Sequence, residues 1–300
     1  INIKSTTDFF FPYCLVHDST TVQSSIFEAL RRLWLDKCPE QIIDDMTPFA
    51  ELFVNIVDDC NIVESECISK NLRRLKSLNR PSASFSYIMK MLHAFKNKEI
   101  SEDDTCSLLF ALEKFLVRRS IVGQEPTGLH ALFKITWDNL SEHTEEAFKE
   151  FVLTKPTIQW PPNEDVRTAI LSRPLAKSNI CNHLLKAYEL SLAGDDVDET
   201  PTKEHILPQR RIEGTPWASS FSEDQHKTLV NTLANIIPLS AELNSEIQAR
   251  EYSFKKEKYL KESMFKTPRI LTTRYQEWTP DEIEHRSNAL ADWALDEWSD

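Results

Sequence analysis

Apolar residues recur at helical spacing from about residue 22 to about residue 192. Runs such as Ile26-Leu30-Leu33 and Leu108-Leu109-Leu112 repeat every three or four positions, as on the buried side of an amphipathic helix. Prolines divide this stretch into helices of ordinary length, at Pro81, Pro126, Pro156, Pro161, Pro162 and Pro174. The pattern predicts a multi-helix domain over residues 1–195.

The pattern changes after a short acidic segment, residues 192–201, which contains Gly194 and Pro201 and is expected to be a linker. Lys203–Leu207 and Asn235–Leu239 then form short apolar runs that are typical of strands. Helical spacing returns from about Ala241 through Ser263. A last helix is predicted at Thr279, because Thr is a capping residue and Pro280 suits the first turn.

The order strand, loop, strand, helix therefore describes residues 196–300, and we expect them to form a second domain. Only four glycines occur in 300 residues, which argues against a Gly-rich phosphate loop and against an all-β fold with many tight turns. No stretch approaches the roughly 20 apolar residues that a membrane span needs. The expected fold class is mainly α.

The six cysteines are scattered and form no C-x-x-C pair: Cys14, Cys38, Cys60, Cys67, Cys106 and Cys181. This usage predicts reduced thiols in a cytoplasmic protein, with neither zinc nor disulfides. The first residue is Ile, and the opening segment lacks the features of a signal peptide. We expect the sequence to be part of a longer chain.

A net charge of −12 weighs against a nucleic-acid partner, because DNA affinity depends largely on lysine and arginine. The charge is unevenly distributed, however, since acidic residues crowd into upstream segments and the linker. Basic residues gather downstream, at Lys203, Arg210, Arg211, Lys255, Lys256, Lys258, Lys261, Lys266 and Arg269. A local basic face in the second domain is compatible with DNA.

Four polar residues of the second domain suit the hydrolysis of a phosphodiester. His205 can act as the base, since an ordinary imidazole is largely neutral at cytoplasmic pH. Glu204 and Asn244 offer the oxygen ligands that Mg²⁺ or Mn²⁺ prefers and that suit zinc poorly. Asn235 can hold the histidine in place. The spacing predicts a metal-dependent nuclease site, with the cation recruited together with the DNA.

The second domain resembles the C-terminal HNH nuclease domain of GmrSD-type modification-dependent restriction enzymes and their relatives in phage defence. The matching residues span about a hundred positions: Glu204–Gln209, Trp217, His226, Leu233–Leu239, Asn244, Ser245, Phe254–Lys256, Ser263, Trp278, Ile283, Arg286 and Trp298. A looser likeness to the helical middle region of these proteins covers Phe115–Gly123 and Gly128-Leu129.

The resemblance implies a small ββα-metal (HNH-like) nuclease domain embedded in helices, with His205 as general base and Asn235 as the middle Asn of the HNH pattern. Asn244 and Glu204 would hold the cation. Lys255 or Lys256 would lie near a phosphate, and the choice stays open because the spacing after Phe254 is one residue shorter than is usual. Lys203 and Arg210, among the downstream basic residues, are also expected to contact DNA. A second departure is Ala234, where the family usually has Gly.

We therefore expect an endonuclease or nickase that acts on DNA, modified or unmodified, in a bacterial restriction or phage-defence protein. The resemblance also implies a preceding nucleotide-hydrolysing, ParB-like domain, and a homo-oligomer is a further expectation. The alternative is a catalytically silent helical module that binds DNA or protein and retains the nuclease scaffold. Arg118 and Arg119 are open to three interpretations: cations at a helix C-terminus, intramolecular pairs with acids, or a DNA or interdomain contact.

Overall fold

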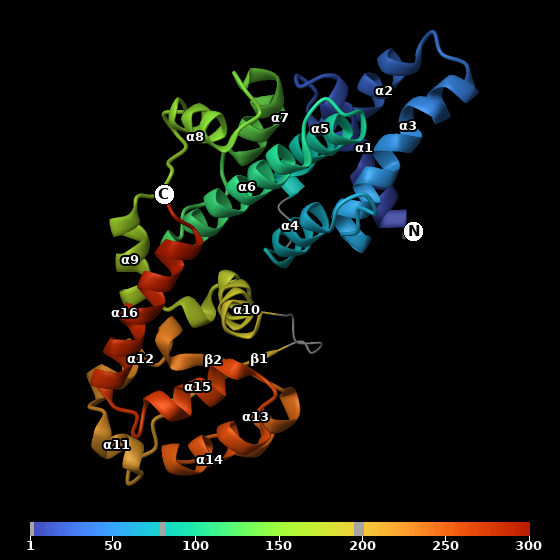
Figure 1. Cartoon of the computed structure of the whole chain (residues 1–300). Helices are drawn as coiled ribbons and strands as arrows, with labels where there is room; N and C mark the ends of the chain where they lie inside the picture. Colours follow the sequence, from blue (N-terminus) through green and yellow to red (C-terminus); the bar gives the residue numbers. More distant parts are fainter. Residues whose placement is uncertain (1–2, 79–81, 195–200) are drawn as a thin grey trace. The chain divides into compact units, whose positions relative to one another are not determined.

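The computed structural model describes residues 3–78, 82–194 and 201–300 (Figure 1). Helices dominate these residues, which confirms the mainly α fold class. Contacts between Cα atoms divide the chain into two compact units. Unit 1 comprises residues 1–116 and 125–160, and unit 2 comprises residues 117–124 and 161–300.

The regular elements of unit 1, in its described residues, are helices. Its helices are α1 (Ile3–His17), α2 (Ile26–Trp34), α3 (Pro39–Val54), α4 (Glu66–Ser77), α5 (Phe85–Lys96), α6 (Glu102–Val122), α7 (Leu129–Asn139) and α8 (Glu145–Leu153). Tyr87 of α5 is fully buried and stacks between Phe133 and Phe148, with ring centroids 6.1 Å and 5.8 Å away. Helix α5 also packs against α1 and α3, so it lies at the centre of this core.

One expectation about the cysteines is wrong. Cys67 of α4 and Cys106 of α6 form a disulfide with their Cα atoms 6.3 Å apart, a separation that allows such a bond. The two residues lie 39 positions apart in the sequence, and only the packing of α4 on α6 brings them together. Cys14, Cys38, Cys60 and Cys181 are outside disulfides.

Unit 2 surrounds one small sheet with helices. In chain order it contains the last residues of α6, α9 (Asn163–Ser172), α10 (Ile180–Ala193), β1 (Thr202–His205), α11 (Pro216–Ser220), α12 (Glu223–Leu229), β2 (Ile236–Leu239), α13 (Ala241–Ile247), α14 (Tyr252–Glu262), α15 (Lys266–Arg274) and α16 (Pro280–Glu297). Helices α10 and α15 both pack against β2, whose residues are all buried (Figure 1). The strand is therefore enclosed, which explains its unbroken apolar sequence.

Strands β1 and β2 pair in antiparallel register, with Thr202 opposite Leu239 and His205 opposite Ile236. Both strands lie within two residues of the predicted bounds. The last helix begins where its capping residues predict, since Thr279 and Glu282 form a reciprocal capping box.

The helical spacing predicted from Ala241 through Ser263 is divided between two helices, because Gln248 adopts a positive φ of 42° that ends α13 before α14 begins. The predicted linker overlaps residues 195–200, which lie outside the described residues. The domain division expected at residue 195 falls within unit 2, between α10 and β1.

No helix in the described part of the chain is long and apolar enough to cross a bilayer.

Candidate active site

Strand β1 presents Glu204 and His205 to opposite sides, because successive side chains of a strand alternate. The Glu204 side faces the interior, and this residue is only 3% exposed. The His205 side is partly open to solvent. Glu204 therefore faces the interior of unit 2, whereas His205 is partly accessible to solvent.

The His205 ring is partly buried, with two amide side chains beside it. Nε2 of Gln209 is 3.1 Å from Nδ1 of His205, and Asn231 also forms a side-chain hydrogen bond with the ring. Burial lowers the pKa of His205 to about 4. The Asn231 hydrogen bond opposes this shift, while the charges of Lys255 and Lys203 add to it. The imidazole is thus neutral at physiological pH, and its Nδ1 lies within hydrogen-bonding distance of the Gln209 amide.

Asn235 fixes the backbone that follows His205. Its Nδ2 donates to the carbonyls of Leu207 and Val230, both at 2.9 Å. Its Oδ1 accepts from the Leu207 amide at 2.7 Å and from the Trp278 indole at 3.2 Å. The side chain is fully buried and uses both donors and both acceptor sites. These contacts fix the segment after His205, and the role of Asn235 in orienting the histidine stays a prediction.

Two further buried side chains hold the same region and received no such role from the sequence. His226 of α12 contacts the Pro208 carbonyl through Nε2 at 2.9 Å. Arg286 of α16 donates to the carbonyls of Ala234 and Ile236, the latter at 3.1 Å. Burial lowers the pKa of Arg286 to about 10, which leaves the guanidinium charged. The available sequence signal for Arg286 was its spacing, three residues after Ile283 and four before Leu290, which places it on the apolar face of α16.

Asn244 of α13 lies against the beginning of β1. Its Nδ2 donates to Oγ1 of Thr202 at 2.8 Å and to the Lys203 carbonyl at 3.2 Å. Among the described residues no donor contacts its Oδ1, and the side chain is partly exposed. The amide oxygen is therefore available to an incoming ligand. Through Thr202 Oγ1, Asn244 contacts the face of β1 that Thr202 shares with Glu204. Through the Lys203 carbonyl it contacts the backbone two residues before His205.

Glu204 and Lys255 occupy a different environment from the one that the sequence suggests. Nζ of Lys255 pairs with Oε1 of Glu204 at 2.6 Å, and the Tyr259 hydroxyl donates to the same oxygen at 2.8 Å. Lys255 has no exposed surface. Burial raises the pKa of Glu204 and lowers that of Lys255, and their opposite charges counter both shifts. In this arrangement Lys255 binds a carboxylate and not the expected phosphate. Glu204 binds the Lys255 ammonium and not the expected metal ion.

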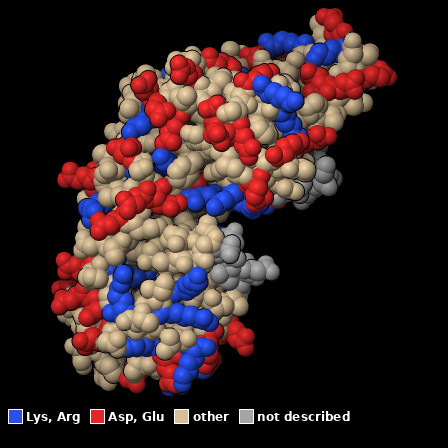
Figure 2. Space-filling model, viewed as in Figure 1, with Lys and Arg blue, Asp and Glu red and all other residues tan. Residues whose placement is uncertain are grey.

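The other predicted DNA contacts lie at the surface of unit 2. Arg210 is exposed, whereas Nζ of Lys203 donates to the Ala176 carbonyl at 3.0 Å and Lys256 pairs with Gln276. Figure 2 shows lysine and arginine side chains gathered over the part of this unit that contains α14 and α15. A basic surface is present here despite the negative charge of the whole chain.

The described residues contain no group of three or more His, Cys, Asp or Glu side chains that could hold a metal ion. Oxygen donors for Mg²⁺ or Mn²⁺ are therefore limited near His205, because Glu204 is already paired. Asn244 Oδ1 fits as one ligand. Since Mg²⁺ keeps several waters and takes substrate phosphates as ligands, such a donor is sufficient only when DNA supplies the rest.

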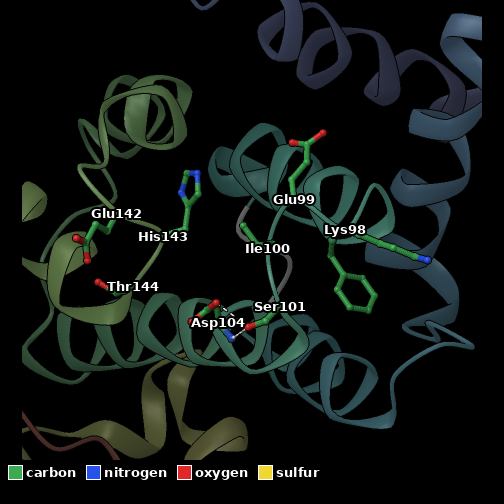
Figure 3. Close-up of a pocket in the computed structure, with 9 residues that line it drawn as sticks. Lys98, Glu99, Ile100, Ser101, Asp104, Glu142, His143 and Thr144 are labelled. Atoms are coloured by element: carbon green, nitrogen blue, oxygen red, sulfur yellow. Dashed lines mark hydrogen bonds between the residues drawn. The ribbon is translucent and has the colours of Figure 1, made fainter.

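A separate cavity of about 660 Å³ lies within unit 1 (Figure 3). Its lining comes from residues 95–104 and 142–144, and the His143 ring stacks on Trp137 with centroids 3.9 Å apart. None of the sequence-predicted site residues lines it.

A comparison with known protein families finds a match that includes His205. Residues 160–293 match the family described as GmrSD restriction endonucleases, C-terminal domain. No curated protein matches the chain. These residues are similar to that domain, and we call residues 160–293 the GmrSD domain.

The GmrSD domain begins at the boundary between the two units and contains His205, Asn235 and Asn244 together with the residues that brace them. The resemblance stated from the sequence is thereby confirmed. The segment Phe115–Gly123 lies before the matched residues, so its likeness to the middle region of these proteins stays a prediction.

Proposed function

We propose that the GmrSD domain of this chain is a DNA nuclease in which His205 is the general base. The observation that carries the proposal is the neutral, partly exposed His205 ring on a backbone held by Asn235. The family description supports a restriction endonuclease, and DNA is the substrate of that class. Strands β1 and β2 with helix α13 would be the ββα framework of an HNH site.

His205 would take a proton from a water molecule as that water attacks the phosphorus in line with the leaving 3′-oxygen. A base must be unprotonated to act, and burial keeps the ring neutral across the physiological range. Asn235 would keep the ring in position through the Leu207 peptide group. Proton removal by a positioned side chain contributes about 10²- to 10⁴-fold to such reactions.

Asn244 would be the protein ligand of Mg²⁺ or Mn²⁺ through Oδ1, beside the phosphate oxygens of bound DNA. The cation would supply positive charge to the phosphate and to the leaving oxygen. Because Glu204 and Lys255 neutralise each other inside the domain, we leave both out of the ligand and phosphate contacts. Lys203, Arg210 and Lys256 remain the candidate contacts to the DNA backbone.

A second candidate function is a catalytically silent module that uses the nuclease framework to bind DNA or protein. The observation that favours it is the absence, in the described residues, of a cluster of three metal-binding side chains. Both candidates have the same fold, so only activity separates them.

The test is cleavage of supercoiled plasmid and of DNA with and without modified bases, in Mg²⁺ and in Mn²⁺. We expect nicked or linear product with the wild type and a loss of about 10²-fold or more with His205→Ala. Asn244→Ala should lose activity as well, whereas His285→Ala, a change at an exposed histidine of α16, should not. Equal cleavage by wild type and His205→Ala would rule out the proposed base. A folded wild type that cuts no DNA would favour the silent module.

A further inference from the structure

Lys255 makes three hydrogen bonds inside the GmrSD domain. Two of them go to backbone carbonyls at the end of β1, those of His205 and of the next residue, Ile206. Its Nζ lies 2.6 Å from Oε1 of Glu204, 2.8 Å from the His205 carbonyl and 3.1 Å from the Ile206 carbonyl. An ammonium has three donor hydrogens, so these partners use all of them. The side chain has no contact with solvent.

These contacts complete a continuous hold on the peptide groups after the proposed base. The Ile206 amide donates to the Asn235 carbonyl at 3.0 Å, and Asn235 binds both polar groups of Leu207 through its side chain. Lys255 holds the two intervening carbonyls. The segment from His205 to Leu207 is thus fixed by α14 and by the residue before β2.

Stability alone is a weak explanation for such a lysine. Burying an ion pair removes two charges from water, and apolar replacements of similar size are often as stable or more so. Tyr259 adds a hydrogen bond to Glu204, so the carboxylate is held against the ammonium by a second buried group. The arrangement specifies where the ammonium sits, at the end of β1 where the strand pairing stops.

We propose that Lys255 is a positioning residue that fixes the His205 backbone through the carbonyls of His205 and Ile206, with Glu204 and Tyr259 holding its ammonium in place. The inference rests on the proposed role of His205 as the base. Lys255 contacts neither DNA nor the attacking water, and acts through the position of the ring.

The neighbouring Lys256 provides a matched control. It lies on the same helix, is partly exposed and pairs with Gln276 of the segment after α15. Lys256→Met removes the same charge from the same helix and leaves the His205 segment intact. Tyr259→Phe removes one partner of Glu204 without touching either carbonyl.

The first measurement is hydrogen exchange of the Ile206 and Leu207 amides in the full chain at pH 7, compared with the buried Leu290 amide of α16. With Lys255→Met we expect exchange at Ile206 and Leu207 to rise about 10- to 100-fold more than at Leu290, because a charged hydrogen bond to the segment is lost. Lys256→Met should leave the exchange rates of the Ile206 and Leu207 amides unchanged. An equal rise at all three amides would overturn the proposal, since it would show only a loss of global stability.

The second measurement is the rate of plasmid cleavage. We expect Lys255→Met to lower kcat about 10-fold or more with KM for DNA within about twofold, the pattern of a misplaced catalytic group. A raised KM with unchanged kcat would contradict the proposal and make Lys255 a DNA contact. If the wild type cuts no DNA, the proposed function fails, yet hydrogen exchange still decides whether Lys255 holds the segment.

Should Lys255→Met alone fail to fold, Glu204→Leu with Lys255→Met removes both charges together and avoids an unpaired buried carboxylate. This double variant should fold, with the same selective exchange at Ile206 and Leu207. Wild-type exchange at these amides in the folded double variant would overturn the proposal.

Discussion

The protonation state of His205 is set by its surroundings. Burial lowers the pKa of this ring to about 4, well below its ordinary value of about 6.5. A base acts only when neutral, so the cleavage rate is expected to stay constant as the pH falls from 8 to about 5.5 and to decline only closer to pH 4. At an ordinary pKa the rate would already drop about tenfold by pH 5.5.

Single-turnover rates across this range test the expectation. If the pH at which the cleavage rate is half-maximal is the same in Mg²⁺ and in Mn²⁺, the decline reports on His205 and not on a water bound to the metal ion. A midpoint near 6.5 would contradict the low pKa.

In the proposed site, Asn244 would hold both the strand and the cation. Its amide nitrogen is bound to Thr202 and Lys203, while its oxygen remains available to a cation. We expect Asn244→Ala to raise the Mg²⁺ concentration needed for half-maximal cleavage about 10-fold or more, because a ligand is lost. Ser245→Ala, at the exposed neighbour, is the control. An unchanged Mg²⁺ requirement would remove Asn244 from the cation site.

The sequence predicted residue types better than residue partners. The position of His205 on β1 and the bracing by Asn235 follow from short motifs whose groups lie near one another in the fold. Glu204 and Lys255 are 51 residues apart and face each other only because α14 packs beneath β1. A carboxylate beside a histidine reads as a metal ligand until the ammonium opposite it is known.

At the scale of elements, the connection between β1 and β2 depends on Asn235. This side chain binds three residues and leaves several buried groups unpaired if it is removed. Asn235→Ala is therefore expected to lower the free energy of unfolding by about 3 kcal/mol or more.

Urea unfolding measures this loss. Asn288→Ala is the control, because Asn288 is exposed and bonds only its own helix, and a change within about 0.5 kcal/mol is expected there. A loss as small as that for Asn235→Ala would show that the hydrogen bonds do not brace the strands.

Strands and capped helix starts were predictable because their signals are local. The pattern of β2 and the capping box of α16 need no information from the rest of the chain. The break between α13 and α14 was missed because Gln248, a residue with no preference for positive φ, takes that conformation. The Cys67–Cys106 disulfide was missed because only helix packing joins its two residues.

At the scale of the whole chain, the end of α6 belongs to unit 2 through Arg118. This fully buried guanidinium donates to the carbonyls of Pro161 and Trp298 and to Asn163 Oδ1, all within unit 2. Arg118 thus binds oxygens of its own chain, and these partners are backbone carbonyls and an amide side chain in place of an acid. The polar segment near residue 195 is a local signal in the sequence. The partners of Arg118 lie 43 and 180 residues away, so no local pattern could reveal that the end of α6 belongs to unit 2.

Arg118→Met is expected to lower the stability of unit 2 by about 3 kcal/mol, because several carbonyls lose a charged donor. The comparison is Arg167→Met, which breaks an exposed pair with Asp292 that is worth about 1 kcal/mol or less. The exchange rates of the α16 amides, measured at increasing temperature, report on the stability of unit 2. Equal effects of the two substitutions would show that Arg118 is not an anchor.

The most direct test of His205 as the base is rescue of the His205→Gly variant by imidazole added to the cleavage assay. If His205 only takes a proton from water, dissolved imidazole can enter the space left by the ring and replace it. We predict that imidazole restores cleavage to the glycine variant and leaves Asn244→Ala inactive. Cleavage by His205→Gly at the wild-type rate without imidazole, or no recovery at any imidazole concentration while the variant stays folded, would contradict the account.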